Sequence, residues 1–206
     1  MKKLLSIVSV ICLIVVGVSA TAMAVPLANG TNVTPVGFGI PSGLPLVVST
    51  GIISFSNVKY SGTLQQDVYH NSTGLLFVYN LTIDGSSLDA VTRMTTTDFD
   101  SFTLDVDAFG TGDTPHQITR TPSGGTVGFQ FNDPENAGDY GIRSTSATMW
   151  IQTNAGMYVR GMTTLQNGRT EDLNTYAPAV PEPGTASLIG LGLVGFVGML
   201  RRKFMA

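Results

Sequence analysis

Apolar residues recur at every second position in several parts of this chain. The clearest run places Phe77, Tyr79, Leu81 and Ile83 on one side, with Asn80, Thr82 and other residues between them. Successive side chains of a β-strand point to opposite faces, so a period of two predicts a strand with one face packed and the other in water. A chain with this pattern is expected to form sheets rather than helices.

Nine segments have this alternation or a strand-like composition, and turn-forming Asn, Asp, Gly and Ser lie between them. They are residues 52–60, 63–70, 77–83, 90–97, 104–108, 116–121, 127–131, 142–153 and 157–165. Eight or nine short strands without intervening amphipathic helices predict an all-β fold. We expect an antiparallel β-sandwich, of which a jelly roll is one form.

The segments on either side of these strands differ in composition. Residues 25–50 are rich in proline and glycine and are expected to form an arm, with one edge strand near 46–48. Residues 51–169 are then the sandwich body. Residues 170–179 are polar and end near Pro178, so we expect a linker there.

The N-terminus has the three parts of a secretory signal peptide. Lys2 and Lys3 come first, residues 4–18 are apolar, and Ala22-Met23-Ala24 is a small-x-small cleavage site. Residues 1–24 are therefore predicted to direct export by the Sec machinery. The only cysteine, Cys12, lies within them, so the mature chain from Val25 onwards is expected to contain no disulfide and no thiolate.

The last part of the chain also has three parts. The first contains Val180, Pro181, Glu182, Pro183 and Gly184. Its two prolines exclude regular helix and sheet, which leaves an extended peptide suited to a protease cleft. An apolar run at 186–200 follows, near the lower length limit for a membrane-spanning helix. The last part is a basic stop, predicted to remain in the cytoplasm, made of Arg201, Arg202 and Lys203.

This arrangement over 180–203 resembles the PEP-CTERM sorting signal, which a membrane-embedded exosortase recognises and removes from exported proteins of Gram-negative bacteria. The resemblance implies a precursor tethered transiently to the inner membrane, then a product at the cell surface or in the extracellular matrix, in contact with exopolysaccharide or biofilm. A permanent membrane anchor is the alternative. Residues 62–64, 68–71 and 74–79 also look like β-rich bodies of other PEP-CTERM proteins, whose biochemical function is not established.

The composition of the body argues against several activities. Residues 25–179 contain more than twice as many acidic as basic residues, which disfavours nucleic-acid binding. His70 and His116 are the only histidines, and no nucleophile motif accompanies them. We therefore predict no catalytic residues, no cofactor and no transition-metal site, and a protein that is not an enzyme.

Acidic residues offer one weak candidate for a metal site. Asp133, Glu135, Asn136 and Asp139 supply oxygen ligands in a glycine-containing loop, as a calcium site requires, although their spacing is not that of an EF-hand. A solvated acidic turn is the alternative. The pairs Asp98/Asp100 and Asp105/Asp107 are each spaced to share one strand face.

The sole tryptophan is the most informative single residue of the body. Met149 and Ile151 are expected to face the core, which places Trp150 on the opposite face among hydroxyl and amide side chains. An exposed indole there would suit stacking on a sugar ring, whereas a loop or sheet edge would bury it. Two functions follow: a non-catalytic surface or matrix protein, or alternatively a carbohydrate-binding module or polysaccharide-active hydrolase.

Overall fold

The computed structural model describes residues 25–132 and 141–180, and every named element in them is a β-strand. The strands are β1 (Val25–Pro26), β2 (Asn32–Val33), β3 (Leu46–Ser56), β4 (Ser61–Asn71), β5 (Gly74–Ile83), β6 (Arg93–Thr96), β7 (Leu104–Phe109), β8 (Gln117–Arg120), β9 (Val127–Gln130), β10 (Thr148–Thr153), β11 (Met157–Gln166) and β12 (Thr170–Ala179). These described residues contain no helix with the length and apolar character needed to cross a membrane.

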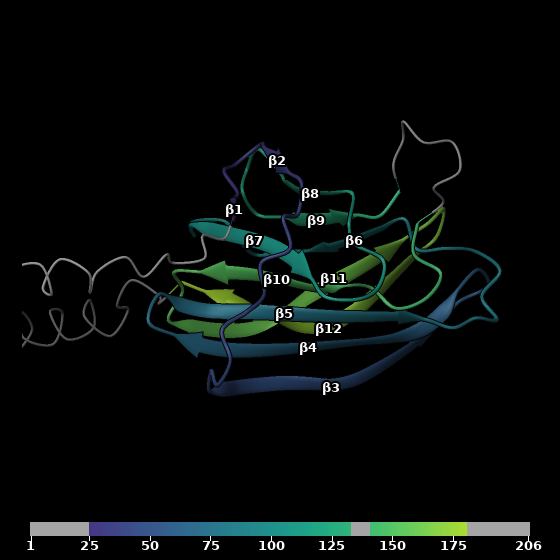
Figure 1. The fold of residues 1–206 in the computed structure, drawn as a ribbon, viewed down its shortest axis with the longest axis horizontal. Helices are drawn as coiled ribbons and strands as arrows, with labels where there is room; N and C mark the ends of the chain where they lie inside the picture. The colour runs from purple at the N-terminus through teal and green to yellow at the C-terminus, as the bar shows by residue number, and fades with distance from the viewer. Residues whose placement is uncertain (1–24, 133–140, 181–206) are drawn as a thin grey trace, which may run out of the picture.

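The strands form two six-stranded sheets in which all neighbours are antiparallel. Sheet A has the order β1-β7-β10-β5-β4-β3, and sheet B has the order β12-β11-β6-β9-β8-β2. The two sheets lie one behind the other in Figure 1. The predicted all-β antiparallel sandwich is confirmed, and its β3-β4-β5 portion is a meander within one sheet. The jelly-roll form stays a prediction.

The space between the sheets is filled by the residues that the period of two placed on one face. Phe77 and Tyr79 of β5 are fully buried, as is Phe129 of β9. The rings of Phe77 and Phe99 are 5.5 Å apart at their centroids and meet edge to face, a favourable aromatic geometry. The rings of Tyr79 and Phe129 are 6.1 Å apart and join the two sheets directly.

The segment 170–179 is strand β12 and not the expected linker. It pairs with β11 along its whole length, from Thr170 opposite Gln166 to Ala179 opposite Met157. Its inward positions include Leu173, which is buried together with two small residues further along the strand. Because most of these inward residues are only weakly apolar, the alternation could not be recognised within a polar segment. Pro178 is tolerated because β12 is an edge strand.

The expected arm, 25–50, is more ordered than its composition suggested. Its first residues form β1 in sheet A, and the chain then crosses to form β2 in sheet B. Residues 34–45 return over the outer face of sheet A, visible in Figure 1 as the purple strand-free segment in front of β10 and β5. The long strand β3 follows at Leu46, where the edge strand was expected.

A side chain of sheet A forms hydrogen bonds with the main chain of β12, the edge strand of sheet B. Gln66 of β4 is fully buried. Its Nε2 donates to the carbonyl oxygen of Tyr176 at 2.8 Å, and its Oε1 accepts from the Tyr176 N–H at 2.7 Å. One amide side chain thus replaces a strand partner for this part of β12 and binds the two sheets together.

A buried guanidinium binds three connections to one another. Arg120 of β8 is 6% exposed, and it donates to the carbonyl oxygens of Gly124, Leu27, Phe99 and Phe102 at 3.0, 3.1, 2.8 and 2.8 Å. Burial lowers the pKa of this guanidinium from its ordinary value. The four carbonyl dipoles compensate the buried charge, so the contacts hold the N-terminal segment, the β6–β7 connection and the β8–β9 turn together.

Truncation of Phe129 tests the core between the sheets. We expect Phe129→Ala to lower the free energy of unfolding by about 3–5 kcal/mol, since it removes a fully buried ring and leaves a cavity. Leu88→Ala, at a residue that is 78% exposed, should change it by no more than about 0.5 kcal/mol. Urea unfolding of the processed protein measures both. A loss below about 1 kcal/mol for Phe129→Ala would contradict the assigned packing.

Replacement of Gln66 tests the contact between β4 and β12. Gln66→Leu keeps the volume but leaves the N–H and carbonyl of Tyr176 without partners, at an expected cost of about 2–4 kcal/mol. Gln65→Leu is the matched control, because Gln65 is the neighbouring residue and its amide donates to the Asp67 carboxylate of its own strand and not to β12. Equal unfolding free energies for the two variants would show that the amide contact does not stabilise the sandwich.

Candidate functional site

The indole proposed for sugar stacking is covered in the folded chain. Trp150 lies in β10 on the outer face of sheet A, between Val78 of β5 and Asp107 of β7. Met149 and Ile151 face the core as expected, but Trp150 is only 5% exposed. Its Nε1 donates to the carbonyl oxygen of Phe38 at 2.9 Å. The face was assigned correctly, whereas the open stacking platform is not present, because the arm lies over it.

An apolar cluster explains why the arm lies there. Leu76, Val78 and Trp150 are buried together on the outer face of sheet A, away from the main core. Ile40 and Leu44, both from the arm, pack against this cluster. The apolar patch on the outer face of sheet A is thereby removed from water by a segment that forms no strand of its own.

The carboxylate of Asp107 fixes the arm in place. It is fully buried beside Trp150, and its Oδ1 accepts from the N–H groups of Val36 and Gly37 at 2.8 and 3.2 Å. Its Oδ2 accepts from the N–H of Phe38 at 2.8 Å. Gly37 has a φ of 87°, a left-handed conformation that glycine adopts without strain and that turns consecutive N–H groups toward one anion. Sequence reasoning missed this role, although an aspartate within an apolar strand was a signal.

The acid pairs behave differently from each other. Asp105 and Asp107 share a face of β7, as the spacing predicted, and burial raises the pKa of the Asp105 carboxyl. Asp98 and Asp100 lie in the connection after β6, and Asp98 has a φ of 69°, so they do not share a strand face. The Asp107 carboxylate is bonded by the arm, so the pair does not present two free carboxylates.

The two histidines lie on separate elements. His70 is exposed near the end of β4, and His116 is exposed in the connection that precedes β8. Within residues 25–132 and 141–180, no three His, Cys, Asp or Glu side chains are grouped so that they could hold a metal ion. The calcium candidates Asp133, Glu135, Asn136 and Asp139 lie outside the described residues.

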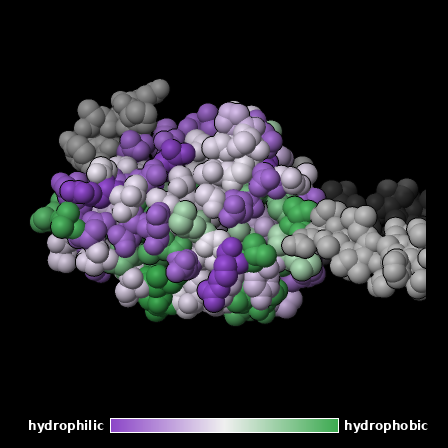
Figure 2. Space-filling model, turned by 180° about the vertical axis from the view of Figure 1, so that it is seen from behind, coloured by the Kyte–Doolittle hydropathy of each residue, from purple (hydrophilic) through white to green (hydrophobic). Residues whose placement is uncertain are grey.

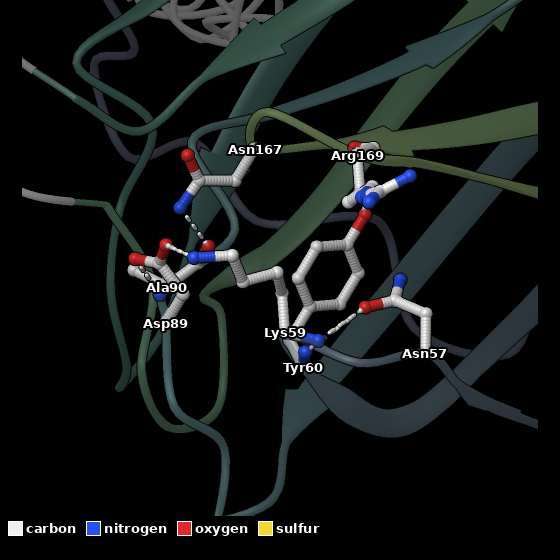
Figure 3. Close-up of polar contacts among 7 residues, drawn as sticks. All are labelled: Asn57, Lys59, Tyr60, Asp89, Ala90, Asn167 and Arg169. Carbon is white, nitrogen blue, oxygen red and sulfur yellow. Dashed lines mark hydrogen bonds and ion pairs between the residues drawn. The ribbon is translucent and has the colours of Figure 1, made fainter.

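A set of polar contacts joins three connections at one end of the sandwich (Figure 3). In the β3–β4 turn, Asn57 Oδ1 accepts from the N–H groups of Lys59 and Tyr60 at 2.9 and 3.1 Å. Lys59 Nζ lies 3.8 Å from Asp89 Oδ2 in the β5–β6 connection. Asn167 Nδ2, in the β11–β12 turn, donates to the carbonyl oxygen of Ala90 at 2.6 Å.

Tyr60 completes this set. Its hydroxyl donates to the carbonyl oxygens of Leu165 and Arg169, at 3.1 and 3.2 Å. Burial raises the pKa of the phenol, which therefore stays neutral and remains a donor. Apart from the ion pair of Lys59 and Asp89, these contacts are made to main-chain groups, and they hold the connections together.

The same end carries a shallow hollow open to solvent. Its volume is about 440 Å³, and it is lined by Gln166, Gly168, Arg169 and Thr170. Arg169 provides a guanidinium at the rim, exposed to solvent. The hollow offers hydrogen bonds to a polar molecule but has no enclosed apolar wall of the kind that most small-molecule sites have.

The comparisons with known proteins concern the segment after the sandwich. Residues 179–203 match the family model of the PEP-CTERM protein-sorting motif. Searches of curated proteins and of solved structures gave no match. The chain therefore carries this sorting motif, as its sequence predicted, and the match begins at Ala179, the last residue of β12.

The motif supports an exported protein that is targeted to an exosortase, with a membrane-anchored precursor. Of the predicted cleavage motif, only Val180 lies within the described residues, and it is exposed. The rest of the motif, the apolar run, the basic stop and the predicted signal peptide lie outside them.

The fluorescence of Trp150 tests its burial directly, because no second tryptophan contributes to the spectrum. We expect blue-shifted emission that resists quenching by acrylamide. Trp150→Ala should lower the free energy of unfolding by about 3–5 kcal/mol, because the indole packs on Val78 and under the arm. Emission near the water-exposed limit, together with an unchanged stability of the variant, would restore the stacking platform.

Proposed function

We propose that this protein is a non-catalytic component of the cell surface or extracellular matrix, exported by the Sec machinery, trimmed by an exosortase and associated with exopolysaccharide. The observation that carries the proposal is the sorting motif over 179–203, placed directly after the last strand of a single β-sandwich. The host is then a Gram-negative bacterium. Cleavage within the motif would release a body that is complete through β12.

The buried polar side chains are consistent with a structural body. Asp107, Arg120, Gln66 and Tyr60 are among the polar groups most removed from water, and each of them bonds main-chain atoms. Their hydrogen-bonding capacity is used to hold connections and edges. This use favours a scaffold over a reactive centre, where such groups would face a substrate.

The surface offers groups that suit contact with polysaccharide. The outward side of β11 and β12 carries Thr164, Asp172 and Asn174, paired across the strands at Met162/Asn174 and Thr164/Asp172. Hydroxyl, amide and carboxylate groups can exchange hydrogen bonds with sugar hydroxyls. Figure 2 shows hydrophilic and neutral residues over most of the visible face. Such a surface would bind a hydrated polymer weakly and at many points, without a dedicated pocket.

Fractionation of the native host tests location and processing together. We expect the matrix fraction to contain a species that begins at Val25 and lacks Arg201, Arg202 and Lys203, as read by intact mass. Deletion of 181–203 should send the protein to the medium or periplasm, while Leu88→Ala should leave its distribution unchanged. Recovery of the basic stop in the surface pool would replace processing with a permanent anchor.

A second comparison in the same experiment tests the association with exopolysaccharide. In a host strain that makes no exopolysaccharide, correctly processed protein should leave the matrix fraction and appear in the medium. Processed protein that stays at the cell surface in that strain would mean that its attachment does not involve polysaccharide.

A further inference from the structure

The four edge strands of the sandwich are protected to very different degrees. In the described residues, sheet A ends at β1 and β3, and sheet B ends at β12 and β2. β1 and β2 are two residues long. β12 is bonded through Gln66 and contains Pro178. β3 has eleven residues, and in Figure 1 it is the outermost strand of its sheet.

β3 lacks two of the features by which edge strands usually avoid pairing, namely proline and charged side chains. Its sequence LVVSTGIISFS contains no proline and no charged residue. Leu46, Val47 and Ile52 are 55%, 41% and 72% exposed. Hydrophobic atoms also gather along the lower margin of Figure 2, the side on which Figure 1 places β3. A long, uncharged, apolar edge is a template for another strand.

Two irregularities interrupt the first half of β3. The register with β4 shifts between Leu46 and Val48 and again between Ser49 and Ile52, where Gly51 has a φ of 64°. The hydroxyl of Thr50 bonds the N–H of Gln66 across this gap at 2.9 Å. From Ile52 to Ser56 the register with β4 is continuous. The regular half therefore presents five residues of undistorted edge, a common strand length.

Charge distinguishes the two halves in the same way. The irregular half lies beside Asp67, which is opposite Ser49. On the regular half, the residues of β4 opposite Ile52 and Ser54 are Gln65 and Thr63, both neutral. The five residues of this half and the β4 residues opposite them are uncharged, and the carboxylates beside them, Asp67 and Asp84, each accept a hydrogen bond from a β4 side chain. An identical strand is also a geometric match, because antiparallel pairing of two equal strands is two-fold symmetric and closed.

We propose that Ile52–Ser56 of β3 pairs antiparallel with the same segment of a second copy of this chain, about a two-fold axis at Ser54. Sheet A then continues into sheet A of the partner. Ser54 lies opposite Ser54 of the second copy, and Ile53 lies opposite Phe55, whose ring is buried and packs 6.2 Å from that of Tyr60. The two cores are thereby joined at the edge. This pairing does not depend on binding of polysaccharide.

Cysteine cross-linking tests the axis. Residues directly opposite in an antiparallel pair have Cα atoms about 4.5–5.5 Å apart, which a disulfide can bridge. We expect processed protein with Ser54→Cys to form a covalent dimer under mild oxidation. Val36→Cys, at a residue that is 59% exposed and bonded to β7, four strands away from β3 in sheet A, should stay monomeric at the same concentration. Equal cross-linking of the two variants would overturn the assigned axis.

Sedimentation measures the pairing without a covalent bond. The unmodified processed protein should dimerise with rising concentration, and Ile52→Lys should weaken the dimer at least about tenfold, because it places two charges at the shared edge. Val36→Lys adds the same charge beside β7, away from β3, and should leave the dissociation constant unchanged. A monomer at all accessible concentrations, or a dimer that Ile52→Lys leaves intact, would overturn the proposal.

Discussion

Strand β5 is apolar on both faces, and much of the surrounding architecture follows from the need to cover both. Phe77, Tyr79 and Leu81 are buried toward sheet B. Leu76 and Val78 are buried on the other side, where there is no second sheet. A strand with this composition cannot lie on the surface of a two-layer sandwich without a third covering element. The arm supplies that cover, and its return from sheet B to sheet A is the route that makes it possible.

Covering a sheet with irregular backbone creates a second problem, which side chains solve. Main-chain N–H groups of such a segment lack ladder partners, and burying them unpaired costs free energy. Asp107 accepts three of them, Arg120 supplies donors to four carbonyls, and Gln66 serves both groups of Tyr176. Each of these three side chains bonds main-chain groups that have no partner strand on that side.

The strands could be predicted from sequence because their signal is local. Phe129 and its neighbours alternate within five residues, and the sorting motif is likewise contiguous. The cover over Trp150 could not be predicted in this way, since the indole N–H bonds a carbonyl 112 residues earlier in the chain. β12 was missed for a different reason: its inward side includes Thr175 and Ala177, which carry little apolar signal until a partner strand and Gln66 define their environment.

The sorting motif follows β12 without a spacer, so the order in which the chain is made determines when the sandwich can close. A chain is synthesised from its N-terminus, so β12 is the last strand of the sandwich to leave the ribosome. Until it does, the amide of Gln66 has no partner on Tyr176, and β11 is an open edge. The motif begins at the residue where that pairing ends. The sandwich can therefore close only after the chain has been made up to the start of the sorting motif, and a chain that stops one strand earlier cannot be a finished body.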